Sequence, residues 1–205
     1  MPAPDPLASL PTPDDGARRS RERVWDESTR PTAPPGPADR PYAAHELAQG
    51  RHLVDVHDHL RGELAQLHEV VGQVVAGTVG VGEARSHLAR TTLRQNTWTL
   101  GAYCQTYCRV VTAHHTLEDV SMLPHLRAAE PGLGPVVDRL EAEHLVIAEV
   151  LERVDRALVA AVAEPGPEGV AAVGLAVDLL SDVLLSHLSY EEHQLVGPLA
   201  RAGFS

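Results

Sequence analysis

Two short motifs in this sequence place a histidine and a glutamate four residues apart. The first joins His114 to Glu118, and the second joins His187 to Glu191. Residues four apart lie on one face of an α-helix, so the imidazole and the carboxylate of each motif would point the same way. Nitrogen and oxygen donors without a thiolate suit iron, manganese or zinc. A single motif of this kind is weak evidence, whereas a mirrored pair on two segments is a specific signal for a metal site.

Two further histidines occupy positions where the helical pattern calls for apolar residues. His57 and His144 each interrupt a stripe of Leu, Ile and Val residues spaced three and four apart. Such stripes mark the buried face of a helix. A buried layer of imidazoles and carboxylates costs several kcal/mol or more without compensation. Bound cations would remove that cost by satisfying the lone pairs.

The elements that must position these side chains are helical. Apolar periodicity predicts helices over residues 43–75, 96–126, 135–163 and 168–202, separated by glycine- and proline-rich breaks, and no segment shows sustained period-two alternation. Four long helices with short connections predict an all-α, antiparallel, up-down-up-down four-helix bundle. At ~1.5 Å per residue, the four histidines then fall in one layer, roughly 15–22 Å from a shared end of the bundle.

The number of donors in this layer favours two metal ions. Two carboxylates that can bridge and four histidines exceed what one ion needs. Three more residues are additional candidates as ligands. His115 lies one step from the ligand face, His59 could replace His57, and Tyr107, two turns before His114, could either reach the metal or simply pack.

Composition and charge bound the rest of the prediction. Residues 1–41 hold most of the chain's 16 prolines and form a disordered or extended arm, leaving residues 42–205 for the bundle. A net charge of −11 argues against nucleic acid. Residues 70–82, among the longest charge-free stretches, are too short and too rich in glycine to span a membrane. The first residues have neither the basic nor the apolar region of a signal peptide, so no secretory signal is expected. Cys104 and Cys108 are interpreted as small buried residues, with a redox pair as the alternative. A cytoplasmic location is expected, and the oligomeric state is left open.

The motifs together resemble the hemerythrin-like, or HHE cation-binding, family. The matching pieces span about residues 53–198 and read His57-x2-Leu60-Arg61, His114-x3-Glu118-Asp119, Glu143-His144-x2-Ile147 and His187-Leu-x2-Glu191-Glu192. The resemblance implies two iron ions bridged by the carboxylates and by an oxo or hydroxo group. It implies as ligands His57, His114, Glu118, His144, His187 and Glu191.

The sequence departs from the oxygen-carrying members of that family at one ligand. Those proteins have a second histidine four residues after the one matched by His144, and this chain has Ala148 there. His115 or solvent would fill the place. An exchangeable position favours sensing or redox chemistry over reversible oxygen carriage. The longer spacing between the first two helices also predicts an extra element near residues 81–94, with a short helix over 83–89.

Three functions follow from these expectations. The first is a di-iron protein that binds or reacts with dioxygen, peroxide or nitric oxide in sensing or in a stress response, with weak peroxide decomposition. The second is an oxidase or oxygenase that activates dioxygen for a small organic substrate. The third is an iron store or a zinc-binding structural bundle. Whether the protein is an enzyme stays open, and if it is, a di-iron oxidoreductase is expected.

Overall fold

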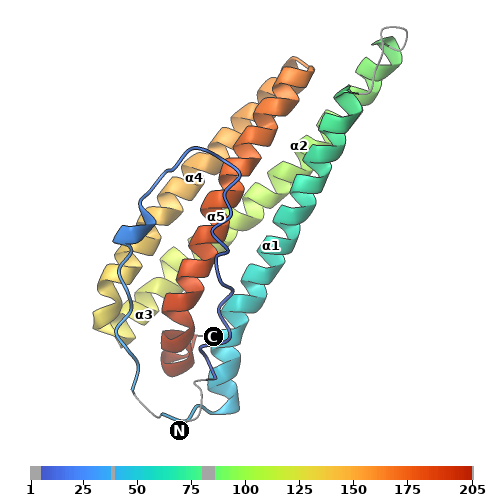
Figure 1. The fold of residues 1–205 in the computed structure, drawn as a ribbon. Helices are drawn as coiled ribbons and strands as arrows, with labels where there is room; N and C mark the ends of the chain where they lie inside the picture. The colour runs from blue at the N-terminus through green and yellow to red at the C-terminus, as the bar shows by residue number, and fades with distance from the viewer. Residues whose placement is uncertain (1–5, 38–39, 80–85, 205) are drawn as a thin grey trace.

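Four long helices form an antiparallel bundle. The computed structural model describes residues 6–37, 40–79 and 86–204, with the backbone alone over 76–79 and 86–100. The helices are α1 (Ala44–Val79), α2 (Ser86–Leu117), α4 (Gly134–Ala163) and α5 (Pro167–Ala202). Helix α1 packs against α2 and α5, and α4 packs against the same two helices, so the four form a closed ring with alternating directions (Figure 1). The predicted all-α, up-down-up-down bundle is confirmed.

Helix α2 is longer at its start than the sequence pattern predicted. It begins at Ser86 rather than near residue 96. Residues 86–94 therefore belong to α2 and form no separate element, and the remainder of the predicted extra element and short helix, residues 81–85, lies outside the described residues. Helix α1 likewise continues through Gly72 to Val79. The connection to α4 runs through α3 (Leu123–Ala129) and a single 3-10 turn (Pro131–Leu133).

A π-helical segment, Glu118–Met122, joins α2 to α3. The Leu123 amide donates to the Glu118 carbonyl, which is the i to i+5 bond of a π-helix. Pro124 follows at once and has no N–H to continue a regular ladder. The widened turn thus begins on Glu118, one of the residues that the sequence singles out. Single π-turns inside α-helices occur often at functional sites.

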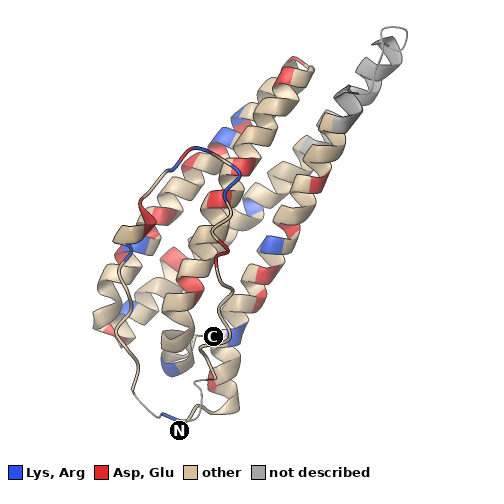
Figure 2. Ribbon diagram, viewed as in Figure 1, with Lys and Arg blue, Asp and Glu red and all other residues tan. Residues whose placement is uncertain are grey.

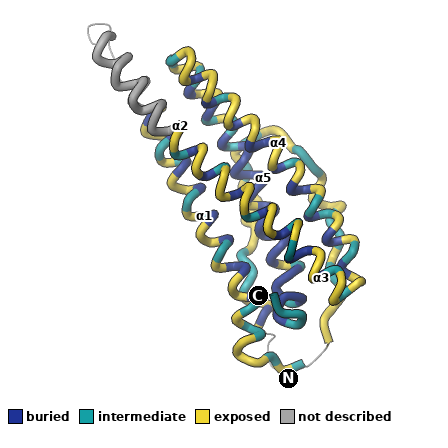
Figure 3. Tube along the Cα trace, turned by 180° about the vertical axis from the view of Figure 1, so that it is seen from behind, coloured by how far each residue is buried: buried dark blue, intermediate teal, exposed yellow. Residues whose placement is uncertain are grey.

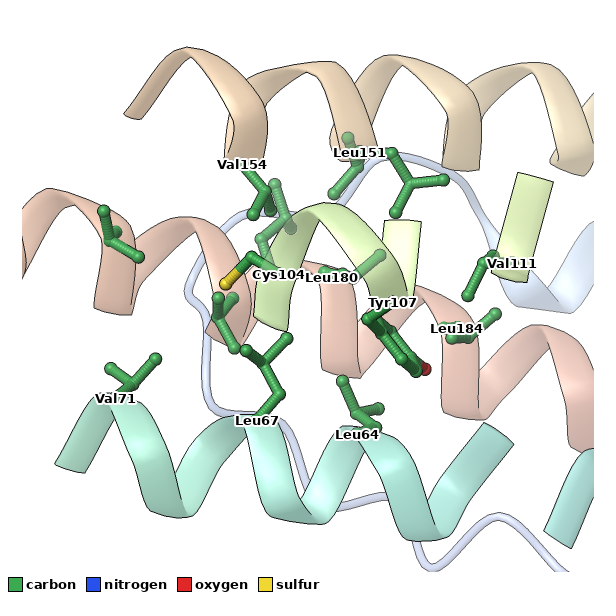
Figure 4. Close-up of a cluster of buried hydrophobic side chains, with 14 of the residues drawn as sticks. Leu64, Leu67, Val71, Cys104, Tyr107, Val111, Leu151, Val154, Leu180 and Leu184 are labelled. Carbon is green, nitrogen blue, oxygen red and sulfur yellow. The ribbon is translucent and has the colours of Figure 1, made fainter. Parts of the chain in front are cut away.

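The core consists of two apolar clusters, one on each side of a polar layer. The cluster towards the α4–α5 connection includes Leu60, Leu64, Leu67, Tyr107, Val111, Ile147, Leu151, Leu180 and Leu184 (Figure 4). The cluster at the opposite end includes Leu53, Leu123, Leu126, Val137, Leu140, Leu195 and Leu199. Burying each such leucine contributes about 1.5–3 kcal/mol. Both ends of the bundle are therefore held by apolar packing, which fixes the height of the residues between them.

Helix α5 is the most deeply buried helix of the bundle. It lies between α1 and α4, and buried positions follow most of its length (Figure 3). By length and composition alone it could cross a membrane, which the sequence analysis did not anticipate, yet 61% of its apolar window is buried inside the bundle. Its apolarity is that of a core helix. Pro198 lies inside it, and the helix nevertheless continues to Ala202.

The proline-rich arm runs in an extended path over α4 and α5. It rises along α5, crosses where Arg18–Arg23 lie, and returns towards the start of α1 (Figures 1 and 2). At the crossing, the amides of Arg19 and Ser20 both donate to Asp182 at 2.8 Å. On the return, Glu22 forms a two-point ion pair with Arg153 of α4. A short 3-10 turn, Glu27–Thr29, interrupts the extended path.

Candidate metal centre

Seven side chains from all four long helices converge in the polar layer between the apolar clusters. Their potential ligand atoms form two groups, and within each group these atoms lie within 4.8 Å of one another. The first group is His57, His114, Glu118 and Glu191, and the second is His115, His144 and His187. The six residues predicted as ligands are thus brought together, and His115, an additional candidate in the sequence, joins them.

Two glutamates connect the groups. Glu118 turns Oε1 to His114 Nε2 at 3.1 Å and Oε2 to His144 Nε2 at 3.6 Å. Glu191 Oε2 lies 3.7 Å from His57 Nε2 and 3.5 Å from His187 Nε2. Each carboxylate therefore faces one histidine of each group, as a bridge between two metal ions would.

The buried lone pairs of this layer fit a pair of metal ions. Among the described residues, the buried side-chain atoms with no hydrogen-bond partner include Nε2 of three histidines and all four oxygens of the two bridging glutamates. The histidines are His57, His114 and His115. A buried polar atom without a partner costs about 1–3 kcal/mol, and more when charged. Cations between the two groups would use these donors together, and nitrogen with carboxylate oxygen suits iron, manganese or zinc.

Three outer carboxylates orient the histidines. Nδ1 of His57 lies 2.9 Å from Glu192, Nδ1 of His187 lies 3.0 Å from Glu143, and Nδ1 of His144 lies 2.6 Å from Asp119. A proton held on Nδ1 leaves the Nε2 lone pair pointing into the layer, which is the usual support for a metal-binding histidine.

No role was predicted for these three acids, although each stands directly beside a predicted ligand in the chain. Adjacent acidic residues were the available signal. Asp119 follows Glu118, Glu192 follows Glu191, and Glu143 precedes His144. Sequence alone does not reveal that each acid serves a histidine of another helix, because that depends on how the helices are rotated in the bundle.

The two histidines of α1 and α5 have raised pKa values. Burial lowers the pKa of His57, but Glu118 and Glu192 outweigh it and raise the pKa to about 9. Burial also lowers the pKa of His187, but contact with Glu143 and Glu191 outweighs it and raises that pKa to about 8. Without metal, these imidazoles keep protons that a cation would displace.

The pKa values of the two glutamates that connect the groups shift in opposite directions. Burial, together with the neighbouring Glu191, raises the pKa of Glu118 to about 8. Burial also raises the pKa of Glu191, but contact with His187 and the charge of His57 outweigh it and lower that pKa. Burial therefore favours the protonated form of Glu118, whereas the neighbouring imidazoles favour the ionised form of Glu191.

The histidines of α2 are neutral by contrast. Burial and the neighbouring charge of His57 lower the pKa of His114 to about 3. Burial, with the charges of His144 and His187, lowers the pKa of His115 well below its usual value. Neutral imidazoles with free Nε2 lone pairs are in the protonation state that metal binding requires.

His115 lies where the second group needs a third nitrogen. Its ring stacks on that of His144, with centroids 4.2 Å apart and an interplanar angle of 10°. Ala148, where the oxygen carriers would have histidine, is exposed on α4. The second group thus contains a third imidazole that comes from α2.

The other candidates lie away from both groups. His59 is exposed on the outer face of α1. Tyr107 is buried in the apolar cluster beside Leu64 and Leu184 (Figure 4), and its hydroxyl donates to the Leu60 carbonyl at 3.2 Å. Both cysteines are free thiols, and burial raises the pKa of Cys104 to about 12 and that of Cys108 to about 11. Thiols held protonated in this way are poor nucleophiles.

Comparison with known proteins gives one match. A family model described as the Hemerythrin HHE cation binding domain matches residues 50–199, a span that holds all seven side chains of the layer and leaves the arm outside. No curated protein and no solved structure matches the chain.

Proposed function

This chain belongs to the hemerythrin HHE cation-binding family, and on that premise we propose that it holds two iron ions and binds or reacts with dioxygen, peroxide or nitric oxide. The observation that carries the proposal is the two-sided placement of Glu118 and Glu191, each facing a histidine from both groups. Carboxylates placed in this way can each be shared by two ions, and the three histidines of the second group provide donors for the second ion. Iron in such a site supplies binding and redox chemistry toward small oxygen and nitrogen ligands.

The unequal nitrogen supply of the two groups indicates where a small ligand would enter. The first group has two histidines, His57 and His114, and the second has three. With the carboxylates shared, the first group leaves more of its coordination to be completed from outside. The side chains therefore favour ligand exchange near His57 and His114.

Two cavities among the described residues lie away from the layer, which favours a small ligand over an organic substrate. One cavity of about 1030 Å³ lies under the arm near Arg40 and Arg201, and another of about 650 Å³ lies between the arm and the outer ends of α4 and α5. Neither is lined by any of the seven layer residues. A substrate oxidase needs a lined space beside the metals, whereas a diatomic molecule or peroxide needs little room.

An anaerobic Fe²⁺ titration followed by exposure to oxygen tests the proposal. We expect binding to saturate at two iron ions per chain and a near-ultraviolet absorption band of oxo-bridged ferric iron to appear with oxygen. Peroxide consumption and nitric oxide binding are then measured on the loaded protein. Saturation with zinc in preference to iron, with no band, would overturn the proposal in favour of a structural bundle.

Alanine variants of His115 on α2 and His59 on α1 provide a matched test of the second group. His115→Ala removes one of its three nitrogens, so we expect about one iron ion per chain and a weaker band. His59→Ala removes an exposed histidine that belongs to neither group and should leave two ions bound. Equal iron content in both variants would show that His115 is not a ligand.

A further inference from the structure

We propose that the N-terminal arm is a working part of the metal centre, in which Arg30 and the main-chain N–H of Thr12 act as positioning groups that hold His187 and His57 through Glu143 and Glu192. This inference rests on the metal-binding part of the proposed function and not on the reaction carried out there. It assigns a role to a segment that lies outside the matched domain.

The first connection runs from Arg30 to His187. Arg30 forms a fork with Glu143, with Nε to Oε1 at 2.8 Å and Nη2 to Oε2 at 2.9 Å. The same Oε2 accepts from His187 Nδ1. Such bidentate pairs fix the geometry of the carboxylate as well as its charge. Arg139 of α4 also donates to Glu143 Oε1 at 2.6 Å. Glu143, and through it the orientation of His187, is therefore held jointly by the bundle and by a residue of the arm.

Arg30 is itself held firmly in place. Its guanidinium lies over the rings of Tyr190 and Trp25, 4.7 and 5.5 Å from their centroids. Its Nη1 donates to the hydroxyl of Ser186 at 2.9 Å. Only 10% of its side-chain surface is exposed, so water competes little for the fork. The fork with Glu143 is therefore held in a fixed, largely dry position.

The second connection runs from Thr12 to His57. The Thr12 amide donates to Glu192 Oε2 at 2.6 Å, and the other oxygen, Oε1, accepts from His57 Nδ1. The hydroxyl of Ser189 donates a hydrogen bond to the Thr12 carbonyl at 2.8 Å. Arg61 pairs with the same carboxylate from α1. One arm segment thus reaches a histidine of the first group, while Arg30 reaches one of the second.

The proline content of the arm suits this role. Prolines restrict the free chain to extended conformations, so less entropy is lost when the arm is laid down on the bundle. The contacts of Thr12, Arg19, Ser20 and Arg30 follow one another along α5 and α4. An arm already biased towards this path can hold two outer carboxylates at little cost.

Retention of Co²⁺ by the full-length protein tests the inference, since Co²⁺ reports its coordination by visible absorption and needs no reaction with oxygen. Arg30→Ala should release Co²⁺ to a chelator about 10- to 100-fold faster than the unaltered protein, the usual effect of losing an outer partner of a metal ligand. Its visible spectrum should also change. Arg30→Lys keeps the charge without the fork and should fall between the two, which preserves the test if Arg30→Ala folds poorly.

Glu22→Ala is the matched control. It removes a two-point ion pair between the arm and Arg153 that touches no outer carboxylate, so its release rate and spectrum should equal those of the unaltered protein. Arg30 variants that behave like Glu22→Ala would overturn the inference. A different result would count against the proposed function alone. In that case the unaltered protein retains Co²⁺, but its iron-loaded form does not react with oxygen, peroxide or nitric oxide.

Discussion

The motifs of α2 and α5 have the same arrangement but different surroundings. In each, a glutamate faces both metal-ligand groups, and the acid that follows it holds a histidine of a neighbouring helix. Asp119 holds His144 and Glu192 holds His57. Glu192 is fully buried beneath the arm and beside Arg61, whereas 39% of the Asp119 side chain is exposed. The carboxylate that holds His57 is therefore shielded from solvent, and the one that holds His144 borders water.

The two helices also differ in backbone. Helix α5 is regular through His187 and Glu191, whereas α2 opens into a π-turn at Glu118. Helix α2 also carries two adjacent histidines, one for each group. The half formed by α2 thus depends on local chain geometry, and the half formed by α5 on packing. Three experiments can break or sharpen this contrast.

The largest effect is expected from the bridging carboxylates themselves. Glu118→Ala and Glu191→Ala each remove a residue that faces both groups, so both variants should retain fewer than two metal ions per chain. Glu118→Ala should lose more, because its two oxygens face different groups. Elemental analysis after desalting measures this, with the exposed Glu149→Ala as control. Two ions retained in both variants would refute the bridging assignment.

A smaller effect is expected from the acids that follow the bridges. Glu192→Ala should weaken metal affinity by about 10- to 100-fold, because nothing replaces a buried partner of His57. Asp119→Ala should lie at or below the lower end of that range, because water reaches the vacated position. Chelator competition with the two variants side by side gives the ratio. A greater loss in Asp119→Ala would reverse the contrast between the buried and the exposed half.

The smallest effect is expected in the pH dependence of the metal-free protein. The folded pKa values of His57 and His187 are raised to about 9 and 8, so their stabilisation is full below their unfolded value of 6.5 and is lost as pH rises through 8 and 9. Those of His114 and His115 are lowered, so their contribution is lost as pH falls below 6.5.

Thermal melting between pH 5 and 9 checks this expectation. The melting temperature of the metal-free protein should fall by a few degrees on both sides of a maximum near neutral pH. His57→Gln should flatten the alkaline side, and His114→Gln the acid side. Metal-loaded protein should show little alkaline loss, because cations replace the protons. A metal-free protein with no alkaline decline would contradict the charged state of the half formed by α1 and α5.

The bundle could be predicted from sequence because its evidence is periodic. Stripes at steps of three and four fix the inward face of each helix, and His57 and His144 stand out because they interrupt those stripes. His115 was harder to place, since a residue next to a ligand normally turns about 100° away from it. It reaches the site because the two groups lie side by side, and their relative position depends on how the helices pack.

The arm illustrates the limit of such reasoning more plainly. Its composition distinguishes it from the bundle but does not reveal what it touches. Arg30 and Glu143 are far apart in sequence, and no local pattern connects them. The outer carboxylates were visible as acids beside ligands, yet their partners depend on helix rotation and on the path of the arm. Pairings of this kind follow from packing, which a single sequence does not display.

The apolar clusters on either side of the polar layer bear on how the protein matures in the cell. Because each end of the bundle is closed by its own leucines and valines, the helices do not need an ion to find one another. We expect the chain to fold before it binds metal, with the side chains of the polar layer already close together. The fraction of metal-loaded molecules would then follow the supply of the metal rather than the rate at which the chain is synthesised.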